Sequence, residues 1–367
     1  MPVYNGEEYL EKSVQSVLDQ SFAWFELILV NDGSTDRTAD LCAEFARKDE
    51  RVRVLTQTNK GAAAARNAGI QASEGRYITF VDADDVLLPK AFEKTVQAME
   101  NRELDLVSFN FSFCSDTGFT EAVYPAFAAA SLEEFWPHFI EYYRANQFFS
   151  LCNKVYRTQL IKGLGLKLDE SLRTGEDIQF NFAYFANLGK MEHLDGIYYE
   201  YWRHAQTLTR AATLDNMETS QRVLHGVRRF LEQCGQSELY PQLAAAQLPW
   251  DAVNFFDLLT DSSKPYTLEE RKAGLEKLFA NPMWHTALMT RLEGREGLYN
   301  GCLRKAAAKK NAGRALLPLR LKGKRSPERS KKEASHARHQ HHHHRIRRKG
   351  LSAPDRAEHP CPELCRF

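Results

Sequence analysis

The chain has 367 residues, of which 43% are hydrophobic and 26% are charged, a composition typical of a soluble globular protein with room for two domains. No stretch approaches the ~18 uninterrupted apolar residues of a membrane-spanning helix, and the N-terminus lacks the pattern of a secretory signal. The seven cysteines are scattered without metal-type pairing, which favours a reduced, cytoplasmic protein.

The net charge of +1 is distributed unevenly. Residues 301–350 contain 17 Lys or Arg against 2 Glu, and residues 351–367 contain 2 Arg against 3 acidic residues, so residues 1–300 carry a net charge of −13. The acidic body and the basic tail therefore need separate explanations.

Predicted strands and helices alternate over the first 113 residues. Leu10, Val14 and Val17 recur at helical spacing, and an alanine-rich segment also favours a helix. Compact apolar runs predict strands at 27–30, 52–55, 77–81 and 106–113, with helices that include 61–73 and 92–99 between them. This order predicts βαβ units and an α/β fold with a mostly parallel sheet.

The pattern changes from about residue 131 to longer, aromatic-rich helical segments, with a short strand expected at 197–201. Leu224, Val227 and Leu231 repeat at helical spacing, and so does a shorter set after Gly274, which weakens that helix prediction. We expect a catalytic domain over 1–212 and a helical region over 213–321. The few apolar residues of 322–367 predict a disordered basic tail.

The start of the chain is unusual for such a fold. Met1 to Tyr4 lead almost directly into a helix, so the strand that should precede this helix is nearly absent. The first strand of such a sheet is usually central and buried, and its truncation would expose apolar neighbours and unpaired backbone groups. We therefore expect the authentic start to lie upstream.

Three carboxylates, Asp82, Asp84 and Asp85, follow a predicted buried strand in the string YITFVDADDVLLP. Open α/β sheets bind ligands at the carboxyl ends of their strands. Oxygen ligands at this spacing suit Mg²⁺ or Mn²⁺, which commonly bind through one or two carboxylates and substrate phosphates. The alternative is a solvated, aspartate-rich turn before a helix.

Four motifs occur in order: PVYNGEEYL, ELILVNDGSTDRT, NKGAAAARNAGI and GRYITFVDADD. Two more, CNKVYR and GEDIQF, follow at 152–157 and 175–180. Together they resemble glycosyltransferase family 2 over residues 2–210, whereas any one of them alone would be a weak signal. The resemblance implies the GT-A fold, a Rossmann-like, mostly parallel sheet with flanking helices.

The resemblance implies nucleotide-sugar binding by residues of the first three motifs, namely Pro2, Val3, Tyr4, Asp32, Lys60 and Asn67. Asp32 would contact the base, usually uracil, and Pro2 to Tyr4 would form the opposite wall. Lys60 could approach a phosphate. The alternative for NDGSTD is a turn in which Ser34 or Thr35 caps a helix.

The Asp-X-Asp signature in VDADD implies that Asp84 binds Mg²⁺ or Mn²⁺ and that Asp82 contacts the ribose or a metal-bound water. Ala83 belongs to the same nucleotide-sugar set. The metal would bridge the donor diphosphate and neutralise the charge that develops on the leaving group.

The family's catalytic base corresponds to Asp177 in GEDIQF, because direct displacement needs a base opposite the leaving group and near the acceptor hydroxyl. Glu176 is expected to contact the acceptor or to be the alternative base. Two acids at a helix start are also favoured by the helix dipole alone. Arg203 and His204 resemble residues that lie near the diphosphate or the metal in family members. The alternative is that this Arg-His pair is structural.

These features predict an inverting glycosyltransferase that moves a sugar from a nucleotide-sugar donor, expected to be a UDP-sugar, to a hydroxyl of a glycan acceptor. The expected pathway is surface or capsular polysaccharide synthesis, with a lipid-linked acceptor as one version. The main alternative is a catalytically impaired sugar-nucleotide-binding protein of the same fold. A nucleotidyltransferase is disfavoured because PVYNGEEYL contains one glycine and two acids where a triphosphate loop is needed.

The end of the chain combines leucines with many cations in LRKAAAKKNAGRALLPLRLKGKR, where Pro318 interrupts any continuous helix, and a histidine cluster, HQHHHHRIRRKG, follows. The first part favours peripheral binding to an anionic membrane surface, with a solvated basic tail as the alternative. The histidine cluster is either a metal-binding segment or an artefact of expression or reading frame. No specific nucleic acid is expected as a partner.

Overall fold

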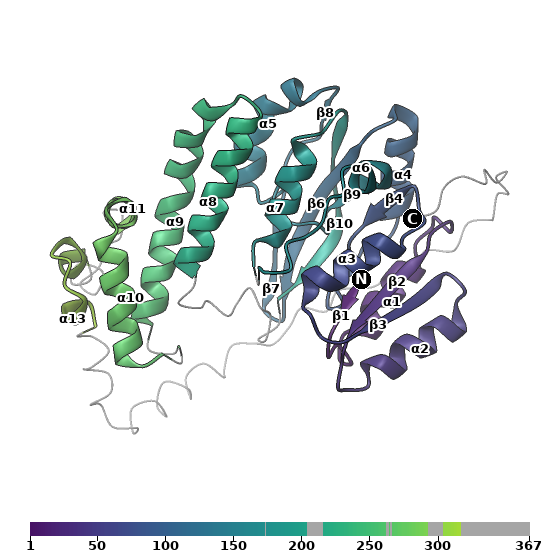
Figure 1. Cartoon of the computed structure of the whole chain (residues 1–367), viewed down its shortest axis with the longest axis horizontal. Helices are drawn as coiled ribbons and strands as arrows, with labels where there is room; N and C mark the ends of the chain where they lie inside the picture. The colour runs from purple at the N-terminus through teal and green to yellow at the C-terminus, as the bar shows by residue number, and fades with distance from the viewer. Residues whose placement is uncertain (173, 204–215, 262–263, 265, 293–303, 317–367) are drawn as a thin grey trace, which may run out of the picture. The chain divides into compact units, whose positions relative to one another are not determined.

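The computed structural model describes residues 1–172, 174–203, 216–261, 264, 266–292 and 304–316 (Figure 1). These residues fall into two compact units that divide after Ala244. The first unit contains β1 (Pro2–Val3), α1 (Leu10–Leu18), β2 (Leu27–Asp32), α2 (Thr38–Lys48), β3 (Val52–Gln57), α3 (Ala62–Ala72), β4 (Tyr77–Thr79), β5 (Val86–Leu87), α4 (Ala91–Arg102), β6 (Leu106–Ser115), β7 (Gly118–Ala122), β8 (Phe127–Ala129), α5 (Leu132–Arg144), β9 (Lys154–Arg157), α6 (Thr158–Gly163), α7 (Glu176–Phe185), β10 (Met191–Trp202), α8 (Asn216–Gln233) and the short helix Ser237–Leu239. Helix α9 (Tyr240–Thr260) crosses the division, and α10 (Leu268–Ala280), α11 (Pro282–Leu292) and α13 (Ala312–Ala315) follow it.

Strands β1, β2 and β3 form a parallel sheet in that order. Helix α3 packs against β2 through small side chains, and its fully buried Ala65 contacts Ile28 and Val30. The alanines of the predicted 61–73 helix thus permit a close approach between helix and sheet. This packing places the ends of β2 and α3 beside each other, where Asp32 and Gly61 lie.

The first strand is as short as the sequence predicts, and its edge toward β2 is paired. The Met1 amino group donates to the Ile28 carbonyl at 2.9 Å, and the Val30 amide donates to the Met1 carbonyl at 2.9 Å. Val3 is buried, with 1% of its surface exposed. The backbone N–H and C=O groups on the side of β1 that faces β2 are therefore hydrogen-bonded.

The second sheet has the strand order β4-β9-β6-β10-β5, with β7 paired to β6 and β8 paired to β10. Within it β6 and β10 are parallel, whereas the other pairs are antiparallel. The expected parallel pairing thus holds for β1–β3 and for β6 with β10. The antiparallel strands lie mainly between residues 118 and 157, where the sequence showed no βαβ alternation and where β6 runs directly into β7.

Helix α8 lies alongside α7 in the first unit (Figure 1). The aromatic rings of Phe182 on α7 and Phe230 on α8 stack with centroids 5.2 Å apart. Gly226 allows this contact, because a Cβ at that position would lie 3.0 Å from the Phe182 ring. The predicted helical repeat of Leu224, Val227 and Leu231 is confirmed as the buried face of α8.

The predicted helix around Leu275 and Leu278 is confirmed as α10. Gly274, which weakened that prediction, is explained by close packing, since a Cβ there would lie 2.7 Å from the Leu259 Cδ2 atom. Among the described residues, no helix combines the length and apolarity that crossing a bilayer requires. The predicted tail, 322–367, lies outside the described residues.

Candidate active site

The carboxylate of Asp32 organises the turn that leads into α3. Its Oδ1 accepts hydrogen bonds from the Gln57 side chain at 2.7 Å and the Lys60 amide at 2.9 Å, and its Oδ2 accepts from the Gly61 amide at 2.7 Å. Asp32 is buried, with 3% of its surface exposed. The residue predicted to contact the base therefore also fixes the loop before α3.

The NDGSTD turn is joined to the N-terminal loop rather than capped by its own hydroxyls. Ser34 Oγ accepts from the Asn5 amide at 3.0 Å, and the Thr35 amide donates to Asn5 Oδ1 at 2.8 Å. Helix α2 begins after Arg37 without a side-chain cap. The alternative prediction that Ser34 or Thr35 caps this helix was wrong, because the Ser34 hydroxyl and the Thr35 amide both bond Asn5 instead.

The other residues predicted to contact the nucleotide lie around these loops. Pro2 and Val3 form β1, and Tyr4 follows with 51% of its surface exposed. The Lys60 side chain is exposed, and Ala83 lies in the loop after β4, near Gly6 of the N-terminal loop. Their contact with a nucleotide stays a prediction.

The three aspartates after β4 have different surroundings. Asp85 is buried and accepts hydrogen bonds from the Tyr199 hydroxyl at 2.6 Å and the Trp202 amide at 2.8 Å. Burial, together with the neighbouring Asp82 and Asp84 charges, raises the pKa of Asp85 well above its usual value. Asp85 thus anchors the aspartate loop to β10, while Asp82 and Asp84 remain partly exposed.

Arg66 on α3 joins the aspartate loop to the start of α7. Its Nη2 donates to Asp82 Oδ1 at 2.8 Å, and its Nη1 donates to Glu176 Oε1 and Asp177 Oδ1, each at 3.3 Å. Only 7% of the Arg66 side chain is exposed. One buried guanidinium therefore holds together the two predicted carboxylate motifs.

Burial raises the pKa values of both carboxylates at the start of α7. Burial and the adjacent Asp177 charge raise the pKa of Glu176 to about 7. Burial also raises the pKa of Asp177, although the Arg66 guanidinium opposes this shift. Three carboxylates share one cation here, so the local charge is excessively negative unless a proton is retained.

Asn67, predicted as a pocket residue, uses its amide to hold the segment that precedes α7. Its Nδ2 donates to the Leu168 carbonyl and to Glu170 Oε1, both at 2.9 Å, and its Oδ1 accepts from the Leu168 amide at 2.9 Å. The neighbouring residues Arg66 and Asn67 thus fix α7 and the segment before it. The sequence did not lead us to expect that Arg66 links the two carboxylate motifs. The signal that could have indicated this role was a single cation within a run of buried small residues.

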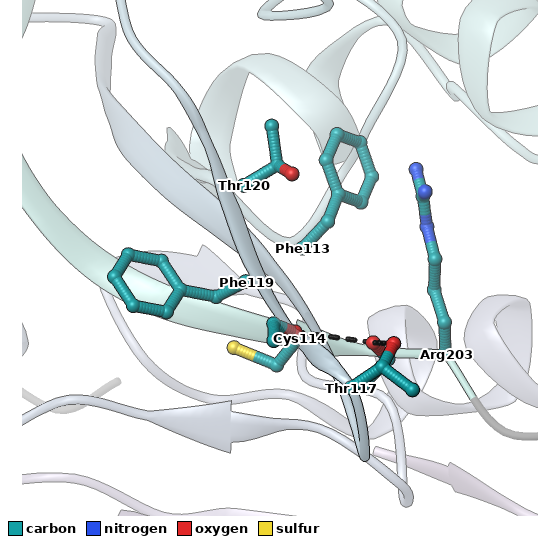
Figure 2. Close-up of a pocket in the computed structure, with 8 residues that line it drawn as sticks. Phe113, Cys114, Thr117, Phe119, Thr120 and Arg203 are labelled. Atoms are coloured by element: carbon teal, nitrogen blue, oxygen red, sulfur yellow. Dashed lines mark hydrogen bonds between the residues drawn. The ribbon is translucent and has the colours of Figure 1, made fainter. Parts of the chain in front are cut away.

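Arg203 lies at the end of β10 beside the β6–β7 hairpin. Its guanidinium carbon is 3.8 Å from the centre of the Phe113 ring, and its amide donates to the Cys114 carbonyl at 2.8 Å. Figure 2 shows the two side chains next to each other at a cavity of about 230 Å³. This stacking is a packing role, and a diphosphate contact stays a prediction. His204 lies outside the described residues.

Residues 1–162 match the sequence model described as glycosyl transferase family 2. The resemblance inferred from the motifs is confirmed, and the six motifs now have a common structural setting around β2, α3, β4 and α7.

Two bacterial relatives illustrate the extent of the sequence similarity. The uncharacterized glycosyltransferase EpsJ of Bacillus subtilis is 32% identical over 212 residues, which cover 57% of this chain and 61% of EpsJ. The putative teichuronic acid biosynthesis glycosyltransferase TuaG of the same species is 38% identical over 118 residues, which cover 32% of this chain and 47% of TuaG. The chain therefore matches about half the length of these two relatives.

The fold of this chain is similar to that of Staphylococcus aureus TarS 1–349, whose crystal structure was solved in complex with UDP-GlcNAc. The TM-score is 0.59 at 20% sequence identity, and the match covers 86% of this chain and 88% of the TarS chain. The predicted α/β, GT-A architecture is confirmed by this similarity.

Proposed function

We propose that this protein is an inverting glycosyltransferase that transfers a sugar from a UDP-sugar to a hydroxyl of a glycan acceptor. The observation that carries the proposal is the contact of one buried residue, Arg66, with Asp82 and with Asp177, which is 111 positions from Arg66 in the sequence. Because the donor motif and the base motif are far apart in the sequence, their contact with one shared cation supports assigning both to one reaction.

The donor class is supported by the fold relatives and by the position of Asp32. Structures of TarS were solved with UDP and with UDP-GlcNAc. Asp32 ends a parallel strand, where open α/β sheets bind nucleotides. Its two oxygens accept three hydrogen bonds and offer about four lone-pair sites, which leaves capacity for a bond from a base.

Asp177 acts as the base that removes the acceptor proton. Its side chain remains 30% exposed, so an acceptor hydroxyl can reach it, whereas Glu176 is more deeply buried at 12%. Arg66 favours the ionised form of Asp177, the form able to accept a proton, and fixes the direction of its carboxylate. Glu176 is the alternative base, and its position behind Asp177 suits a contact that positions the acceptor.

The residues present fit a divalent cation held mainly by Asp84. The Asp-X-Asp pattern gives the role of principal ligand to Asp84, which is partly exposed, whereas Asp85 is held by Tyr199 and Trp202. One or two carboxylates with substrate phosphates are the usual protein ligands of Mg²⁺, and Mn²⁺ takes similar oxygen ligands. When bound, the ion would supply Lewis-acid stabilisation of the departing nucleoside diphosphate.

All of these residues lie within 1–212, the proposed catalytic domain. We place the protein in the cytoplasm, in surface or capsular polysaccharide synthesis, and the printed name of TuaG supports this class of pathway. A lipid-linked acceptor and peripheral membrane binding through the basic tail are further parts of the proposal.

The test is nucleotide release from a panel of UDP- and GDP-sugars with Mn²⁺, with and without added glycans. Asp177→Asn should lower turnover by about 10²- to 10⁴-fold, the usual contribution of a general base, while UDP affinity changes little. Asp84→Asn should instead weaken Mn²⁺-dependent UDP binding. The matched control is Asp40→Asn, a change at an exposed position on α2 that should leave turnover unaltered.

Unchanged turnover in Asp177→Asn and Asp84→Asn would contradict these site assignments. A chain that binds UDP with Mn²⁺ but turns over no sugar nucleotide would instead be the binding protein considered as the alternative.

A further inference from the structure

A second concave surface lies on the first unit, between α8, α7 and the segment before α7. Its volume is about 700 Å³, within the range of ligand sites. Arg222, His225 and Arg229 of α8 line one wall, and Gln179 of α7 and Asp169 line the other. We call this surface the α8 groove.

The basic residues of the α8 groove form a stripe. Arg222, His225 and Arg229 follow the spacing i, i+3, i+7, which places them on one face of the helix. Arg222 donates to the Thr219 hydroxyl at 3.3 Å, and neither Arg222 nor Arg229 forms an ion pair within the described part of the chain. The stripe therefore presents two guanidinium groups whose charge no described carboxylate neutralises.

The acidic residues in the lining have partners of their own. Glu232 Oε1 accepts from Arg228 Nε at 2.8 Å. Asp169 Oδ1 accepts from the Ser171 amide at 2.9 Å and the Ser171 hydroxyl at 2.6 Å, and these bonds lower the pKa of Asp169. Residues 1–300 carry a net charge of −13, so two arginines without a described carboxylate partner on one concave surface are opposite in sign to the average charge of the body.

The α8 groove is joined to the carboxylates of the candidate active site through the start of α7. Gln179 follows Asp177 by two positions, so about 3 Å of helix rise separates them. The Thr174 hydroxyl lies 3.4 Å from the Thr219 hydroxyl of α8, and a Cβ at Gly175 would lie 3.6 Å from Val223. Since the side chains of Asp177 and Gln179 point to different faces of α7, a ligand in the groove would approach Asp177 by continuing along α8 toward its N-terminal end, where α8 contacts the start of α7.

We propose that the α8 groove binds an anionic glycan, the acceptor of the reaction, through its phosphate or carboxylate groups. Guanidinium groups form paired, charge-assisted hydrogen bonds with both kinds of anion, whereas a neutral glycan gains nothing from an unneutralised arginine. Arg222 and Arg229 hold repeating anionic units while a hydroxyl further along the chain meets Asp177. This assignment rests on the proposed function, because it makes the bound glycan the acceptor.

The test is polymer binding to the full chain at ~0.15 M salt, measured by calorimetry with a polyuronate, poly(glycerol phosphate) and neutral dextran. The wild type should bind at least one anionic polymer and discriminate against dextran. The double variant Arg222→Ala, Arg229→Ala should bind that polymer at least ~10-fold more weakly, because two charge-assisted contacts are lost. Preference for polyuronate or for poly(glycerol phosphate) identifies the anion.

The matched control is Arg37→Ala, Arg47→Ala, which removes one exposed arginine just before α2, one exposed arginine on α2, and the same amount of charge. The basic tail is identical in all three proteins, so a difference between them reports on the substituted side chains. Equal losses in the two double variants, or no loss in either, would overturn the proposal. Anionic lipid vesicles are a further probe. If Arg222→Ala, Arg229→Ala weakens binding to these vesicles but not to either anionic polymer, the proposal is also overturned and a membrane contact is indicated.

This assay needs neither donor nor turnover, so its result is independent of the nucleotide-release test. Groove binding without sugar transfer would contradict the proposed function alone. Transfer without groove binding would contradict the anionic acceptor alone.

Discussion

Two charge clusters of the first unit, around Arg66 and along α8, are organised in opposite ways. At Arg66 one buried guanidinium is shared by Asp82, Glu176 and Asp177. Along α8 the exposed arginines have one carboxylate partner among the described residues, Glu232, which pairs with Arg228. The first arrangement has an excess of acid that can accept protons or bind cations, and the second has an excess of base that can bind anions. The contrast predicts that substitutions at Arg66 affect folding, whereas those along α8 affect ligand binding.

The largest effect should come from Arg66→Met, which removes the shared cation while keeping a similar length of side chain. Breaking a buried ion pair on one side leaves uncompensated charge and typically costs about 3–5 kcal/mol. The free energy of unfolding, measured by urea denaturation at pH 7, should fall by an amount in this range. Arg47→Met on exposed α2 is the control, and a loss at Arg66 no larger than in this control would remove the basis of the comparison.

A second effect should appear in the pH dependence of stability. The pKa of Glu176 is about 7 in the folded protein and about 4.5 without its surroundings, so the folded state holds more protons between these values. The contribution of Glu176 to the free energy of unfolding is present in full below pH ~4.5. It is lost as the pH rises through ~7, a change of roughly 3 kcal/mol. Glu176→Gln should therefore gain stability relative to the wild type across this window.

The measurement is urea denaturation of both proteins at several pH values between 4.5 and 7.5. Glu50→Gln, a change of an exposed glutamate, is the matched control and should track the wild type at each pH. A constant difference between Glu176→Gln and the wild type would show that Glu176 does not titrate in this range.

The smallest effect should come from Arg228→Ala, which breaks the ion pair with Glu232 on α8. Both side chains are well exposed, at 62% and 48%, and such a pair one helical turn apart contributes about 0.3–0.5 kcal/mol. Thermal unfolding should therefore shift only slightly. A loss comparable to that of Arg66→Met would show that the α8 charges are structural and would weaken the distinction between the clusters.

The sequence was sufficient for many of the local elements of the first 115 residues. Helices α1, α3 and α4 and strands β2, β3 and β6 follow from apolar periodicity, because each buries one face or lies wholly inside the first unit. The antiparallel partners of β6 and β10 could not be predicted, since pairing between β9 and β6 joins segments about 50 positions apart and leaves no local pattern. Gly274 was misleading because its role depends on Leu259 of another helix.

The candidate site was predictable only in part. Family motifs indicated Asp82, Asp84 and Asp177, but no spacing rule could show that Arg66 rather than Asn67 links Asp82 to Asp177. That distinction depends on how α3 is rotated against β2, which Ala65 and the residues around it determine by packing. The α8 groove likewise requires α7 and α8 to be adjacent, a tertiary contact that the sequence alone does not reveal.

The most direct test of the central claim is anomalous diffraction from a crystal that contains Mn²⁺ and UDP. The account predicts a manganese peak beside Asp84, with the uracil near Asp32 and the diphosphate end of UDP directed toward the side of the site where Asp177 lies. A manganese ion or a nucleotide bound away from these residues would contradict it.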